Sequence, residues 1–402
     1  MRIEEFVAHY GLELAEAKPP DPTPREVGFG TAVEAALRRR VRPGRRLAWL
    51  DNTFPWRGSG FRYHEALAIH ELRPDTLFFA SYRLADPFPV PVHHVSDFGR
   101  RAARHGITDV YGVFQLFLEG LVGMHDRTVA QEAFPGPDIS QALRRLRLRL
   151  HGMVYPGGGF VPTQDGFERV RALATRLSTT FSYVPEVLDA VPGAVAVPQA
   201  LTATGFYRPS TGRWSARTPL VCLFAADDPP RKGLDTAIAA FRDLNPTAFH
   251  LHVVGPHEHR RAELPEPLAT FHGWLEPEQL AELHRRVHVF LSPVRAEPPG
   301  PRGSHAGVTD GFPTQAAADA MSSGCLLVSS NPADDHRVLS RGTDYVPSEA
   351  TPAAVRDAVL RVAADLPAAR RVAERGQATV RERMDIRRST ELKLRHMGLF
   401  EE

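Results

Sequence analysis

The clearest chemical feature of the sequence is a lysine in a short turn. Nearly all basic residues of the chain are arginine, and the only lysines are Lys18, Lys232 and Lys393. Lys232 follows the apolar run LVCLFAA, lies between Arg231 and Gly233, and precedes the helical pattern LDTAIAAF. A helix N-terminus and a point charge would converge there, so the turn could bind a phosphate. A charged surface turn is the alternative reading of the same residues.

A second segment that could bind a phosphate is TDGFPTQAAADAMSSG. Pro313 suits the first turn of a helix, and Thr314 and Gln315 would leave backbone N–H groups free at its N-terminus. Two solvated carboxylates on a helix packed against a sheet are the alternative. The candidate residues of this segment are Asp310, Gly311, Phe312, Pro313, Thr314, Gln315 and Asp319.

The N-terminal half contributes a histidine and a glycine-containing loop. The alternating run RLRLRLHG predicts a strand that ends at His151, where the side chain could contact a substrate. A hydrogen-bonded polar residue at a sheet edge is the alternative. Gly58 and Gly60 lie between an expected strand and its helix. A third glycine at dinucleotide spacing is missing, so we expect no nicotinamide site.

Length and composition exclude several classes of protein. A chain of 402 residues usually forms two domains, and 43% hydrophobic with 24% charged residues is typical of a soluble globular protein. No apolar run approaches the roughly 20 residues of a membrane helix, and the N-terminus does not resemble a secretory signal. We therefore expect a cytoplasmic protein. The net charge of +2 argues against a nucleic-acid partner.

The remaining titratable clusters predict no metal or redox centre. Cys222 and Cys325 each lie in an apolar stretch and should be buried thiols. His257, Glu258 and His259 lack a suitably spaced third ligand, so we expect a surface cluster and no bound metal. The arginine-rich stretches 38–46 and 144–149 could attract an anionic acceptor or a membrane surface, although solvated faces are the simpler interpretation. At most, peripheral membrane contact is expected.

The elements that must position these residues alternate between strand and helix. Such alternation predicts parallel, doubly wound sheets. The polar, turn-rich stretch 198–219 interrupts the pattern, and we interpret it as a hinge. The predicted organisation is an N-terminal domain over 1–197, a C-terminal domain over 220–386, and a last helix over 387–402 that packs back on the N-terminal domain. Ligands should bind in the cleft between the two halves.

A third pattern, FHGWLEPEQLAELHRRVHVFLSPV, lies between the Lys232 turn and the TDGFPTQAAADAMSSG segment. The order of the three patterns along the chain is informative. A strand leads through prolines into Lys-Gly, a glycine turn precedes a Glu-Leu helix, a strand ends in Ser-Pro, and Asp-Gly-Phe leads into Asp-Ala-Met and Gly. Together these patterns, over roughly 180–385, resemble the C-terminal domain of glycosyltransferase family four. That resemblance implies a GT-B fold of two Rossmann-like domains with an interdomain cleft.

The resemblance also implies an activity and roles for individual residues. A hexose-type sugar would be transferred with retention from a UDP- or GDP-sugar to a glycan, lipid-linked or small-molecule acceptor, without a cofactor or metal. Lys232 would bind the donor diphosphate, Asp310 would lie under the sugar, and Asp319 would bind the ribose. The segment 312–315 would surround the diphosphate and the turn 271–274 would hold the base. The expected catalytic residues are His151, Lys232 and Asp310, and Gly58, Gly60, Arg231, Gly273 and Gly311 complete the donor-binding set.

Two departures from the family pattern leave other functions open. The family usually has an arginine six residues before the lysine, whereas this chain has Ala226, and Arg231 or Arg295 would have to replace it. The family's two glutamates, eight residues apart, correspond to Asp310 and Asp319, nine apart. A catalytically degenerate protein that only binds a nucleotide or glycan is therefore one alternative. A GT-B nucleotide-sugar epimerase is another.

Overall fold

The computed structural model describes most of the chain. The described residues are 3–15, 44–124, 137–155, 160, 163–210, 213–215, 219–227, 230–264, 266–296 and 311–400. They divide into two compact units. The N-terminal unit contains the described residues up to Pro198 and those from Arg387 onward, and the C-terminal unit contains those from Gln199 to Ile386. Each unit is described by itself.

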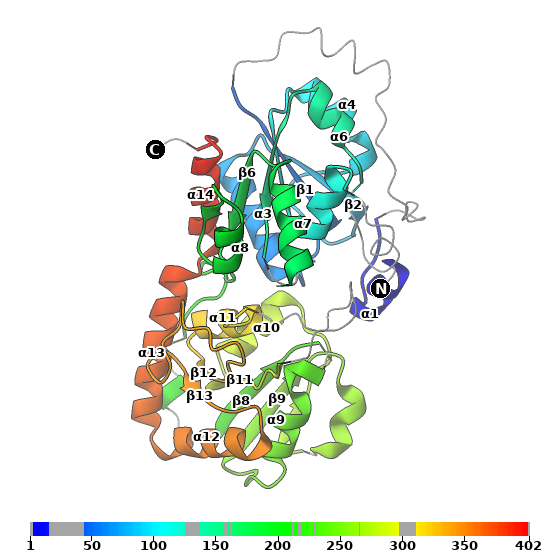
Figure 1. Cartoon of the computed structure of the whole chain (residues 1–402). Coiled ribbons are helices and arrows are strands. Elements are labelled where there is room, and N and C mark those ends of the chain that lie inside the picture. Colours follow the sequence, from blue (N-terminus) through cyan, green and yellow to red (C-terminus); the bar gives the residue numbers. More distant parts are fainter. Residues whose placement is uncertain are drawn as a thin grey trace. The chain divides into compact units, whose positions relative to one another are not determined.

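The N-terminal unit is built on a parallel sheet, which has seven strands among the described residues, in the order β3-β2-β1-β4-β5-β6-β7 (Figure 1). Because β1 lies between β2 and β4, the chain changes direction at the β1/β4 boundary, which is where ligands of doubly wound sheets bind. The strands are β1 Leu47–Phe54, β2 Leu77–Arg83, β3 Val92–His94, β4 Asp109–Val113, β5 Arg149–Met153, β6 Thr179–Ser182 and β7 Val195–Ala196.

Helices cover this sheet and bury its central strands. All eight residues of β1 are buried, as expected for a central parallel strand covered on both faces. The described helices are α1 Ile3–Tyr10, α3 Gly60–Leu72, α4 Phe98–His105, α5 Gln115–Leu121, α6 Ser140–Arg145, α7 Gln164–Ala174, α8 Pro185–Ala190 and, at the end of the chain, α14 Ile386–His396.

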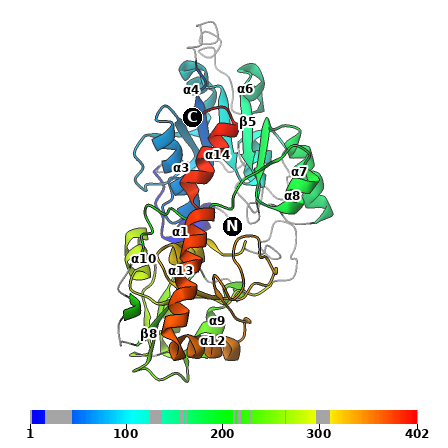
Figure 2. The same cartoon turned by 90° about the vertical axis from the view of Figure 1, so that its left-hand side faces the viewer.

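The last helix, α14, completes the core of the N-terminal unit and lies beside α3 (Figure 2). Leu394, Met397 and Leu399 are buried in the same apolar cluster as the strands. Lys393 is also buried, where it pairs with Glu65 of α3. These contacts place residues that are far apart in sequence in one hydrophobic core.

The C-terminal unit repeats the same topology with a parallel sheet that has six strands in the described part of the chain, in the order β10-β9-β8-β11-β12-β13. Its change of direction lies between β8 and β11. The strands are β8 Leu220–Ala225, β9 Phe249–Val254, β10 Ala269–Phe271, β11 Val289–Ser292, β12 Leu326–Ser329 and β13 Val346–Pro347. The helices are α9 Leu234–Phe241, α10 Pro277–His284, α11 Gln315–Ser322, α12 Pro352–Ala364 and α13 Leu366–Arg383.

Two apolar clusters pack on opposite faces of this second sheet, because successive strand side chains point to opposite sides. Along β12, Leu326 and Val328 join the cluster formed with α9 and α12, whereas Leu327 joins the cluster formed with α11. Cys222 and Cys325 are both fully buried free thiols.

The stretch that we interpreted as a hinge is largely packed into the C-terminal unit where it is described. Arg213 is buried, and its Nη1 donates to the carbonyl oxygens of His284 and Val287, each at 2.8 Å. Together with the Cys325 thiol, this guanidinium satisfies the buried carbonyl groups at and just after the end of α10.

The predicted fold class is confirmed: both halves are α/β units with parallel sheets of Rossmann type. Two details differ. The apolar pattern RRLAWLD predicts a first strand that ends at Asp51, whereas β1 continues to Phe54, and no pattern in the sequence predicts the short strand β3. Both differences arise because pairing with β2 orders these residues, and pairing between distant segments leaves no local periodicity.

Candidate functional site

The Lys232 turn packs directly on the chain that leaves the neighbouring strand β11. Lys232 ends a 3₁₀ turn after β8, and Gly233 then begins helix α9 with a φ of 80°. A Cβ on Gly233 would lie 2.2 Å from the carbonyl oxygen of Pro293. Only glycine allows both this left-handed conformation and this close approach. The Lys-Gly pair therefore fixes the lysine at the β8/β11 boundary.

Arg295, in the segment that follows β11, also contacts the Lys232 turn. Its backbone N–H donates to the carbonyl oxygen of Arg231 at 2.7 Å, and its Nη2 donates to Oγ1 of Thr236 in the first turn of α9 at 2.5 Å. Arg231, Lys232 and Arg295 thus gather at the carboxyl ends of β8 and β11. This is the position at which doubly wound sheets bind ligands, and its charge suits an anion.

Helix α11 packs against β11 and β12, and its N-terminus is capped by the side chain of Thr314. The Oγ1 of Thr314 accepts a hydrogen bond from the N–H of Ala317 at 3.3 Å. Phe312 is buried against the ring of Tyr345, with 5.0 Å between ring centroids. The described part of the predicted segment thus starts at Gly311 and continues through Pro313 and Gln315, whereas Asp310 lies outside the described residues.

Asp319 lies in the middle of α11 with its side chain buried. Hydrogen bonds from Gln315 and Tyr207 hold its carboxyl group, but burial outweighs them and raises the pKa of Asp319 well above its ordinary value. Its Oδ1 has no hydrogen-bond partner in the described part of the chain. The carboxyl group is therefore a buried acceptor within the C-terminal unit and not the solvated carboxylate of the alternative interpretation.

The buried state of Asp319 leads to a prediction about stability. A raised folded-state pKa lowers the free energy of unfolding as pH rises above the unfolded-state pKa of about 3.9, by about 1.4 kcal/mol per pH unit until the folded-state pKa is reached. Asp319→Asn removes this loss. We expect the variant to gain thermal stability relative to the natural protein between pH 4 and pH 8. The exposed Asp243→Asn is the control, and a relative loss for Asp319→Asn would contradict the assignment.

The predicted base-binding turn, 271–274, is hydrogen-bonded to the segment that follows β9. The carbonyl oxygen of Gly273 accepts the N–H of Gly255 at 3.0 Å, and Trp274 next to it is 46% exposed. His257, which we expected on the surface, is fully buried, and its Nε2 donates to the carbonyl oxygen of Ala226 at 2.9 Å. The surface interpretation of His257 was therefore wrong. Among the described residues, no group of three His, Cys, Asp or Glu side chains could hold a metal.

His151 is not at the carboxyl end of its strand, so that prediction was wrong. It is the third residue of β5, and the following Gly152 does not end the strand. A Cβ on Gly152 would lie 2.6 Å from a Leu118 methyl group and 2.9 Å from one of Leu177, so glycine is required by close packing of the strand.

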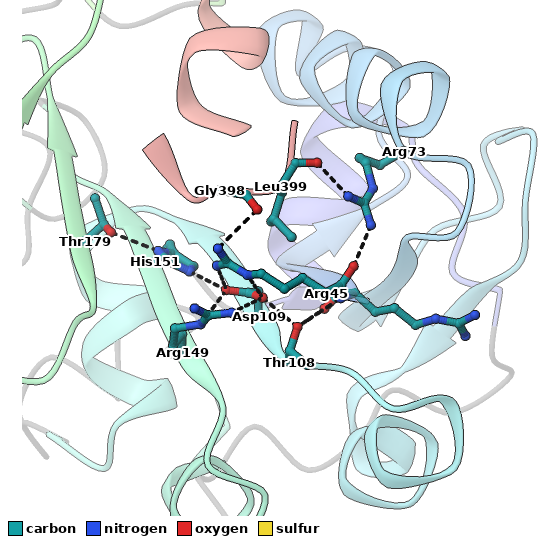
Figure 3. Close-up of polar contacts among 10 residues, drawn as sticks. Arg45, Arg73, Thr108, Asp109, Arg149, His151, Thr179, Gly398 and Leu399 are labelled. Atoms are coloured by element: carbon teal, nitrogen blue, oxygen red, sulfur yellow. Dashed lines mark hydrogen bonds and ion pairs between the residues drawn. The ribbon is translucent and has the colours of Figure 1, made fainter. Parts of the chain in front are cut away.

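The contacts of His151 are those of a structural residue. Its Nε2 bonds Oδ1 of Asp109 at 2.9 Å and its Nδ1 bonds Oγ1 of Thr179 at 3.0 Å (Figure 3). Asp109 begins β4, so the histidine ring faces the amino-terminal edge of the sheet, opposite to the edge at which ligands bind. The hydrogen-bonded alternative for His151 is therefore the one that its contacts support.

Gly58 and Gly60 lie at the β1/α3 junction, beside a buried ion pair that the sequence did not predict. Arg62 of α3 contacts Oδ1 of Asp51 in β1 at 2.5 Å, and both side chains are buried. Burial raises the pKa of Asp51, and the nearby Arg62 guanidinium opposes that rise. The available signal was an aspartate within an otherwise apolar strand, beside the change of direction between β1 and β4.

Residues 218–365 match the model of the family described as glycosyl transferases group 1. The C-terminal unit therefore resembles a group 1 glycosyltransferase domain. The match spans β8 to α12 and includes the Lys232 turn, the Gly273 turn and α11. Together with the fold, it indicates that the chain is a glycosyltransferase. The comparison with curated proteins finds no significant match.

Solved structures with the same fold support the GT-B assignment of this glycosyltransferase. HepE of Anabaena, solved in complex with UDP and glucose, is 14% identical with a TM-score of 0.63, and sucrose-phosphate synthase of Thermosynechococcus elongatus is 14% identical with a TM-score of 0.61. Each alignment covers 88% of this chain and 99% of the other. A glycosyltransferase of Rickettsia africae is 9% identical with a TM-score of 0.62, over 88% and 98% of the two chains.

None of the described helices has the length and hydropathy that crossing a membrane requires.

Proposed function

We propose that this glycosyltransferase belongs to the retaining family four and transfers a hexose-type sugar from a UDP- or GDP-sugar to a glycan, lipid-linked or small-molecule acceptor. The observation that carries the proposal is the packing of the Lys232 turn against the β11 exit, inside the region that matches the group 1 family. The HepE structure, which contains UDP and glucose, supports a nucleotide-sugar donor through its fold.

The proposed chemistry depends on stabilising the departing diphosphate. The bond between the anomeric carbon and the diphosphate oxygen breaks, and the electron pair leaves with the nucleotide diphosphate. The acceptor hydroxyl forms the new bond to the same carbon and transfers its proton to an oxygen of the departing diphosphate. Lys232 would neutralise the negative charge on the leaving oxygen, a contribution that grows in the transition state. Arg231 and Arg295 would add positive charge from the same turn, without a metal ion.

Other residues of the C-terminal unit would position the donor. The backbone of 312–315 at the start of α11 would contact the diphosphate. The family resemblance assigns the ribose to Asp319, whose carboxyl group is buried within the C-terminal unit. The turn at Gly273 and the exposed Trp274 would hold the base. Asp310 would lie under the donor sugar.

Isothermal titration calorimetry with UDP, GDP, ADP and TDP tests the donor site. We expect one of these nucleotides to bind, and the sugar nucleotides of that base should then release labelled sugar to added acceptors. Analysis of the anomeric configuration of the product tests retention. Absence of binding by all four nucleotides would overturn the proposal.

Ala226 favours one second candidate, a nucleotide- or glycan-binding protein without turnover. This alanine supplies no cation where the family usually has arginine, and its carbonyl group is already bonded to His257. The discriminating observation is turnover. Nucleotide binding without release or transfer of sugar from any matching donor would select the binding protein over the enzyme.

A further inference from the structure

A separate cavity of about 710 Å³ lies within the C-terminal unit, at the carboxyl ends of β11, β12 and β13 and beside α12. These elements can be followed in Figure 1. The volume is within the usual range for small-molecule sites, roughly 300–1,000 Å³. The cavity does not include Lys232, Gly273 or the first turn of α11. Of the residues assigned to the donor, it shares only Arg295.

The cavity has a buried floor with charged groups around it. Ser329, Ser330 and Tyr345 are buried, and the serine hydroxyls are bonded to backbone carbonyl groups. A hydrogen bond between the Tyr345 hydroxyl and the Asn331 side chain fixes the ring. Such a floor is preorganised, so a small ligand would not have to order it.

Three arginines and three carboxylates line the same space, and one of these carboxylates, Asp334, is within 2.8 Å of His336, which also lines it. Arg295, Arg341 and Arg361 form no ion pair with a carboxylate of the described residues, and neither Glu349 nor Asp357 is paired with a cation there. In contrast, Arg356, also on α12, pairs with Asp243 at 3.6 Å. Arg341, Glu349, Asp357 and Arg361 are all exposed, so a ligand that enters the cavity from solvent could reach their charged groups.

The chemistry of these groups selects a class of ligand. Guanidinium groups bind phosphate through paired N–H donors, and carboxylates accept hydrogen bonds from hydroxyl groups. The carboxylates would repel a bare polyanion, whereas the three arginines exceed what a neutral sugar needs. We propose that this cavity is a second ligand site that binds a phosphorylated monosaccharide, with the arginines on the phosphate and Glu349 and Asp357 on the hydroxyls.

Arg295 connects this site to the Lys232 turn. It lines the cavity, while its backbone N–H bonds Arg231 and its guanidinium bonds Thr236. A bound phosphate that reoriented Arg295 would therefore act on the turn that we assign to the donor. The proposed site does not depend on the donor assignment, because Arg341 and Arg361, whose variants test it, lie outside the Lys232 turn.

The experiment is calorimetric titration of the full chain with glucose 6-phosphate, with and without saturating UDP. We expect binding in both cases, and Arg341→Ala and Arg361→Ala should each weaken it at least 10-fold. Arg356→Ala is the matched control on the same helix, and it should bind glucose 6-phosphate like the natural chain. Glucose and inorganic phosphate should each bind at least 10-fold more weakly than glucose 6-phosphate.

Three results would overturn the proposal. They are absence of glucose 6-phosphate binding at millimolar concentration, loss of binding when UDP is present, and equal binding by the natural chain and the two cavity variants. Circular dichroism of each variant verifies that it is folded. The outcome is separable from the donor proposal, because UDP binding is measured independently in the same series and is not expected to change in Arg341→Ala or Arg361→Ala.

Discussion

Replacing Lys232 with alanine is expected to lower the rate of sugar transfer by about 100- to 1,000-fold, the usual cost of removing one group that stabilises transition-state charge. Lys232 is only half-buried, so its loss should leave the fold intact. The packing of Gly233 on Pro293 would keep the turn in place without the charge. Steady-state kinetics with the donor identified by titration measure the effect.

The kinetic parameters distinguish catalysis from simple binding. If Lys232 acts mainly on the leaving group, kcat should fall more than KM rises, because the charge that it neutralises develops as the bond breaks. Lys232→Arg keeps the charge and should recover part of the rate. Arg242→Ala removes an exposed cation just after the C-terminal end of the same helix, α9, and should leave kcat unchanged. Near-normal turnover in Lys232→Ala would contradict the assigned role.

Replacing Asp109 with alanine is expected to lower the free energy of unfolding by about 3–5 kcal/mol, as is usual when one member of a buried ion pair is removed. Asp109 is fully buried, accepts a hydrogen bond from Arg45 at 2.6 Å, and pairs with Arg149 at 3.0 Å and with His151 at 2.9 Å (Figure 3). Its removal leaves these donors without their acceptor.

The same cluster predicts a pH dependence. Hydrogen bonds from His151, Arg45 and Thr108 hold the pKa of Asp109 well below its ordinary value, although burial acts in the opposite direction. A depressed folded-state pKa stabilises the protein above the unfolded-state value of about 3.9, and that stability is lost as pH falls below it. Asp109→Ala should therefore reduce the acid sensitivity of unfolding as well as the stability at pH 7.

Urea denaturation at pH 7 and at about pH 2.5, which is below the unfolded-state pKa, tests both effects. The control is Asp97→Ala, which removes a half-exposed carboxylate paired with Arg100 at the surface. That change should cost less than about 1 kcal/mol. Equal stability of the two variants would show that the Asp109 cluster does not hold the N-terminal unit together.

The elements and the lysine turn could be predicted because their signals are local. Apolar runs identify buried strands, and Lys232 and Gly233 are neighbours between a strand and a helix. The partners of these residues could not be predicted. Pro293 and Arg295 reach the turn only because β8 pairs with β11, and His257 reaches Ala226 only because β9 pairs with β8. Strand order and register decide such contacts, and neither leaves a periodic pattern in one sequence.

The wrong prediction for His151 has the same cause. Its sequence neighbourhood indicated a strand correctly, but the glycine after it was interpreted as the end of that strand. The reason for Gly152 lies in Leu118 and Leu177, which occupy the space of a side chain. Similarly, nothing near Asp51 in sequence indicated Arg62 as its partner, since a helix must first pack on the sheet to bring the two together.

The place of α14 in the N-terminal core has a consequence for synthesis on the ribosome. Leu394, Met397 and Leu399 fill that core, and Arg45 and Arg73 donate to the carbonyl oxygens of Gly398 and Leu399 at 3.1 and 2.6 Å. The ribosome translates residues 199–386 after the first part of the N-terminal unit and before its last part, residues 387–402. This takes on the order of 10–40 s in cells. During this interval the nascent N-terminal unit exposes an unfilled apolar groove, so the first unit to be synthesised is the last to be completed.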